Sequence, residues 1–115
     1  MSINLDYLNE LSGNDAEFVI DILSTFLEEN PKDVEELRTA IQEKDIKEVG
    51  KLSHKMKSSL QMLGAEEVRS LALQIEQNIK KEAIDFAQAK TWATQLIAQV
   101  TALYPLVKAK IAELG

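Results

Sequence analysis

The chain has 115 residues, of which 45% are hydrophobic and none is cysteine, so the sequence predicts one soluble domain without disulfides, thiol nucleophiles or cysteine-based metal sites. Its net charge of −6 argues against nucleic acid and against an anionic membrane surface as partners, because both require clustered Lys and Arg. No apolar run reaches the ~18 residues needed to span a membrane, and the N-terminus lacks the features of a secretory signal, so we expect a cytoplasmic protein.

The predicted elements are all helical, because good helix formers dominate and only four Gly and two Pro interrupt them. The first is a short helix marked by Leu5, Leu8 and Leu11, which ends at Ser12-Gly13. We interpret it as a short addition to a larger bundle.

The second predicted element covers residues 14–43. Asn14 is its expected N-cap, because Glu17 three residues later completes a capping-box pattern. A stripe of apolar residues with helical spacing runs on both sides of Pro31. Two interpretations stay open, namely two abutting helices or one long helix that is kinked at the proline.

Three further helices follow in the sequence. Asp45 is the expected cap of a helix that runs to Leu63, with Gly64 as its C-terminal turn residue. The next helix opens at residue 65 or 66 and ends at the lysine pair 80–81, and the last runs from residue 83 or 84 to about residue 113, with a bend at the proline at position 105. Because the connections are short, neighbouring helices should be antiparallel. The predicted fold is an all-α, up-down four-helix bundle with a short additional N-terminal helix, formed by residues 1–115 as one domain.

His54 is the only histidine. At about 100° per residue, the apolar positions of the helix 45–63 occupy an arc of roughly 120°, and His54 lies about 150° from its centre. The helical phase therefore predicts an imidazole in solvent, either as an ordinary surface residue or as part of a site.

The neighbours of His54 favour a site. Gly50 lies one turn before it and Ser58 one turn after, and we expect Gly50, on the solvent side, to leave room beside the imidazole. Gln61 lies two turns after on the same face. The strip is flanked by lysines, and no carboxylate of this helix joins them after Glu48; these lysines are Lys47, Lys51 and Lys57.

An exposed imidazole among cations suits nucleophilic chemistry. A metal site needs three or four ligands, and one histidine without cysteine is a poor start for such a site. A Ser-His-Asp hydrolase needs a cleft and a buried acid. A histidine that accepts a phosphoryl group instead gains negative charge, which Lys57 and Ser58 are placed to stabilise.

The run His54-Lys55-Met56-Lys57-Ser58-Ser59, with Gly64 ten residues after the histidine, resembles the histidine-containing phosphotransfer (HPt) domain. The resemblance covers most of the chain and extends to the preceding and following helices. It departs from the family pattern at Ser58, where a glycine is usual, and at Gln61, where many members have a small residue. In some members a polar residue of the following helix hydrogen-bonds the histidine, and the matching position here is Glu76.

The resemblance implies a phosphorelay intermediate. His54 would accept a phosphoryl group from the phospho-aspartate of a receiver domain and pass it to an aspartate of another receiver. The implied partners are response-regulator receiver domains and a hybrid sensor histidine kinase, and the expected Mg²⁺ belongs to the receiver, with no cofactor bound by this chain. We expect a monomer without kinase activity of its own, since no glycine-rich nucleotide loop is present.

The docking surface implied for these partners surrounds His54. Besides the residues already named as its neighbours, it includes Lys55 and Met62. A different interpretation is a non-catalytic helical adaptor, which would bind a receiver or another partner through the same face without phosphorylation.

Overall fold

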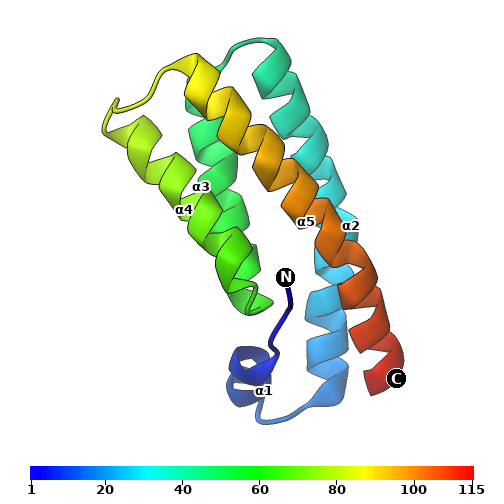
Figure 1. The fold of residues 1–115 in the computed structure, drawn as a ribbon. Helices are drawn as coiled ribbons and strands as arrows, with labels where there is room; N and C mark the ends of the chain where they lie inside the picture. Colours follow the sequence, from blue (N-terminus) through cyan, green and yellow to red (C-terminus); the bar gives the residue numbers. More distant parts are fainter.

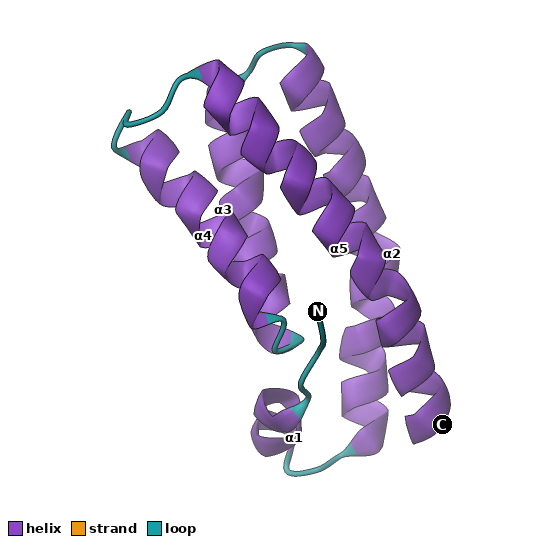
Figure 2. Cartoon of the chain, viewed as in Figure 1, coloured by secondary structure: helices purple, strands orange, loops and turns teal.

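The computed structural model describes residues 1–115 and contains five helices and no strand (Figures 1 and 2). They are α1 (Asp6–Ser12), α2 (Ala16–Gln42), α3 (Ile46–Met62), α4 (Glu66–Lys80) and α5 (Phe86–Leu114). Helix α2 packs against α3 and α5, and α4 packs against the same two helices. The predicted four-helix bundle with a short N-terminal helix is therefore confirmed.

Helix α2 is a single helix that continues through Pro31. Buried residues on both sides of the proline, such as Phe26 and Val34, pack into the same core and hold the two halves together. The expected N-cap was wrong by one residue. Asp15 accepts hydrogen bonds from the backbone N–H groups of residues 17 and 18, whereas Asn14 adopts a left-handed conformation (φ 64°) in the preceding turn.

The ends of α3 are those that the sequence predicts. The Asp45 carboxylate accepts from the backbone N–H of Glu48, and Gly64 closes the α3–α4 turn with a φ of 63°. Helix α5 begins about two residues later than predicted, because Asp85 caps it by accepting from the Gln88 N–H. It also continues through its internal proline.

The core is an apolar cluster to which all five helices contribute. From α3 it receives Val49, Leu52, Met56 and Leu60. This face fixes the rotation of α3, and thereby directs the opposite face, which carries His54, into solvent. No helix combines the length and the apolar character that crossing a membrane requires.

The N-terminal segment before α1 runs back to the α3–α4 turn (Figure 1). The Asn4 N–H donates to the Leu63 carbonyl oxygen at 2.9 Å. A Cβ at position 64 would clash with the carbonyl oxygen of Asn4. Gly64 is therefore required both by its left-handed backbone and by the close passage of this segment.

Candidate functional site

His54 projects from the middle of α3, and 63% of its side chain is exposed. This agrees with the rotational phase that the sequence predicts. Met56 and Ser53, its neighbours on the core face, are fully buried. The packing of α3 thus places the imidazole in solvent while the backbone of His54 stays in a regular helix.

The imidazole is held by a carboxylate from the next helix. Nδ1 of His54 lies 2.6 Å from Oε1 of Glu76, which is on α4. A carboxylate accepts hydrogen bonds, so Nδ1 carries the proton and, in the neutral ring, Nε2 carries the lone pair. This contact orients the ring and leaves Nε2 as its nucleophilic atom.

The same carboxylate binds a lysine. Nζ of Lys57 lies 2.9 Å from Oε2 of Glu76, an ion pair rather than a well-aligned hydrogen bond, and Oε2 is buried from solvent. The Lys57 and Glu76 side chains are only 24% and 20% exposed. Burial raises the pKa of Glu76, but the contacts with Lys57 and His54 outweigh burial and hold this pKa below its ordinary value. The carboxylate is therefore charged and links both functional side chains of α3.

His54 borders a groove of about 570 Å³ between α3 and α4, and the α4–α5 connection also contributes to its lining. Its other lining residues are Ile46, Lys47, Gly50, Glu76, Ile79, Lys80, Glu82 and Ile84. The sequence predicted Gly50 on an open solvent face, and this is wrong. A Cβ at position 50 would lie 3.0 Å from Cγ2 of Ile79. The glycine permits the close approach of α3 and α4, so packing explains it.

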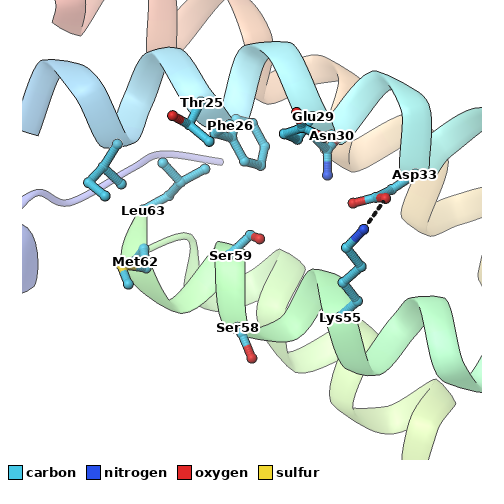
Figure 3. A pocket seen from close by; sticks show the side chains of 11 residues that line it. Thr25, Phe26, Glu29, Asn30, Asp33, Lys55, Ser58, Ser59, Met62 and Leu63 are labelled. Carbon is cyan, nitrogen blue, oxygen red and sulfur yellow. Dashed lines mark hydrogen bonds and ion pairs between the residues drawn. The ribbon is translucent and has the colours of Figure 1, made fainter.

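Lys55 points away from His54. Its Nζ donates to Oδ1 of Asp33 on α2 at 2.8 Å, and this Asp33 side chain is only 8% exposed (Figure 3). The hydrogen bond and the charge of Asp33 raise the pKa of Lys55. Lys57, one of the three lysines predicted to flank His54, is also paired with a carboxylate from another helix, so the positively charged strip is weaker than expected.

A second cleft, of about 320 Å³, lies between α2 and α3, on the side of α3 away from the first groove. Met62 lines it, and Ser58 lies at its edge with the hydroxyl pointing away from α2 (Figure 3). The cleft has an apolar wall, to which Phe26 belongs, and a polar end at the Lys55–Asp33 pair. It does not contain His54.

The remaining predicted residues of α3 lie on its exposed surface. Lys47 and Lys51 are exposed and form no ion pair. Gln61 is exposed near the N-terminal segment, where it borders a shallow depression with Asn4 and Gly64, and it makes no hydrogen bond to His54. The structure thus brings Gly50, Lys57 and Glu76 to His54, and leaves Gln61 and Lys55 apart from it.

A buried polar cluster that was not predicted from the sequence lies beside the second cleft. Asn30 and Asp33 are buried on α2, and the Tyr104 hydroxyl of α5 donates to Oδ1 of Asn30 at 2.6 Å. Burial, followed by the charge of Asp33, raises the pKa of Tyr104 to about 12. The sequence pattern indicates that these two positions are buried, because positions 30 and 33 continue the helical spacing of the buried residues Phe26 and Leu37.

Comparison with known proteins yields one match. The family model described as Hpt domain matches residues 21–109, which contain all of α3 and α4 and most of α2 and α5. The comparisons with curated proteins and with solved structures found no match.

Proposed function

Because the chain belongs to the Hpt domain family, we propose that His54 accepts a phosphoryl group from the phospho-aspartate of one receiver domain and passes it to the aspartate of another. Hpt domains are phosphocarriers of phosphorelays that interact with receiver domains, and they are not kinases. The observation that carries the assignment to His54 is its geometry, with an exposed ring whose Nδ1 lies 2.6 Å from a charged carboxylate.

The geometry supports a defined transfer step. The Nε2 lone pair attacks phosphorus as the bond from phosphorus to the aspartyl oxygen breaks, and the bonding electrons leave with the aspartate carboxylate. The Nδ1 proton stays on the ring, where Glu76 accepts its hydrogen bond and stabilises the positive charge that the ring acquires. Transfer to the next receiver is the reverse of this step.

The partners in this proposal are response-regulator receivers and, upstream, a hybrid sensor histidine kinase. The receiver supplies Mg²⁺, and this chain supplies the nucleophile and a docking face as a cytoplasmic monomer. Ser58 and Met62 on one side of His54, and Lys47 and Lys51 on the side toward the start of α3, form that face. The exposed lysines suit a partner whose phosphorylated site is acidic.

The test is phosphoryl transfer from radiolabelled, phosphorylated receiver domains to the purified chain. We expect an acid-labile label on the wild type and none on His54→Gln, since the chain has no other histidine. The His54 side chain is exposed, so the variant should retain its far-UV circular dichroism and its binding of receivers. Receiver binding without any label on the wild type would instead identify a non-catalytic adaptor.

A further inference from the structure

Lys57 is not free to bind a phosphoryl group on His54. Its Nζ is already 2.9 Å from Oε2 of Glu76, in a pair of which each side chain is less than one quarter exposed. Partial burial protects such a pair from the screening that makes exposed ion pairs weak. If Lys57 moved to a phosphoryl group, it would leave a buried carboxylate oxygen without its cation.

Phosphorylation of Nε2 would place a second anion on the ring that Glu76 already contacts. Oε1 of Glu76 is 2.6 Å from Nδ1, so the carboxylate and the phosphoryl group would sit on opposite nitrogens of one imidazole. Both are strong acceptors for a lysine ammonium group. The phosphoryl group and the Glu76 carboxylate would therefore compete for the ammonium group of Lys57.

Resting on the proposed function, we propose that Glu76 withholds Lys57 from the phosphoryl group and thereby keeps phospho-His54 short-lived. The chain is then suited to passing the group on rather than to storing it. Glu76 acts here as a positioning residue through its ion pair with Lys57. The substitution Glu76→Gln retains a carbonyl oxygen that can accept from Nδ1–H, removes the negative charge and releases Lys57.

The experiment labels His54 with phosphoramidate, a small donor that needs no partner, and follows the loss of label. In this loss a water oxygen bonds to phosphorus, the phosphorus–Nε2 bond breaks with its electrons returning to Nε2, and inorganic phosphate is released. We expect Glu76→Gln to lengthen the half-life of the label roughly three- to tenfold, which lies within the range of coupling between residues in contact.

A double-mutant cycle tests whether Lys57 carries the effect. With Glu76 present, Lys57→Met should change the half-life less than about twofold, whereas in the Glu76→Gln background it should shorten it roughly three- to tenfold. Glu66→Gln is the matched control. Glu66 also pairs with a cation, Arg69 at 3.0 Å, but lies ten residues earlier on α4, about 15 Å away along the helix axis.

The outcomes separate this inference from the proposed function. The inference would be overturned if Lys57→Met changed the half-life equally with and without Glu76→Gln. It would also be overturned if Glu76→Gln left the half-life unchanged or shortened it. Either result leaves the phosphocarrier role standing. Failure of both phosphoramidate and receivers to label His54 would overturn both. Should Lys57→Met not fold, the Glu76→Gln half-life alone decides.

Discussion

Nδ1 of His54 and Oε1 of Glu76 lie 2.6 Å apart, although α3 and α4 contribute them from positions 22 residues apart. The contact joins the one exposed imidazole to a carboxylate that also pairs with Lys57. One carboxylate therefore serves the histidine and the fold together, since it ties α3 to α4.

This carboxylate makes the stability of the bundle sensitive to acid. The folded-state pKa of Glu76 lies below the value of 4.5 that an ordinary glutamate has. Its contribution is therefore present above about pH 4.5 and is lost as the pH falls through the folded-state value. We expect Glu76→Gln to reduce the free energy of unfolding by about 1 kcal/mol at pH 7, and the difference from the wild type to shrink below pH 4.5. Urea unfolding at pH 7 and at pH 3.5 measures it, and an equal difference at both values would contradict the assignment.

The ion pair between Lys55 of α3 and Asp33 of α2 should contribute more to the free energy of unfolding than the unpaired lysines of α3 do. Lys55→Met leaves the Asp33 carboxylate, which is 8% exposed, without a cation, and should cost about 1–3 kcal/mol of unfolding free energy. Because Lys55 itself is 61% exposed, the loss should fall short of that for a fully buried pair.

The control for this prediction is Lys51→Met, one turn earlier on the same helix. Lys51 is exposed and has no ion pair, so its substitution should stay within about 0.5 kcal/mol. Adding Asp33→Asn to Lys55→Met should recover part of the loss. Equal costs for the two lysines in denaturant unfolding would show that the Asp33 contact contributes nothing.

Gly64 and Gly13 offer a matched test of backbone strain against steric contact. Both have a left-handed backbone, with φ of 63° and 67°, but a Cβ meets Asn4 only at position 64. We expect Gly13→Ala to cost about 1–2 kcal/mol for the backbone alone, and Gly64→Ala to cost at least about 1 kcal/mol more.

Hydrogen exchange shows where the additional destabilisation of Gly64→Ala arises. In Gly64→Ala the N-terminal segment must move, so the Asn4 amide should lose the protection that its 2.9 Å bond to Leu63 provides. In Gly13→Ala it should keep that protection. Retained protection at Asn4 in Gly64→Ala would mean that the segment is not held by the α3–α4 turn.

Local patterns in the sequence were sufficient to predict each helix and the exposure of His54. The apolar spacing of α3, its cap at Asp45 and its end at Gly64 depend on residues within a few positions of one another, and helical geometry converts that spacing directly into a face. The start of α2 was placed one residue early because Asn14 and Asp15 both suit a cap, and the start of α5 was placed early because Asp85 was not identified as its cap.

The partners of the charged and small residues were decided by tertiary structure alone. Whether Lys55 and Lys57 are free depends on Asp33 and Glu76, each about twenty residues away, and whether Gly50 faces solvent depends on Ile79 of the neighbouring helix. The amino-acid sequence determined which residues lie on each helical face, because that follows from the backbone period. Only the packing of the helices determined which faces meet, because electrostatic and steric contacts act through space and not along the chain.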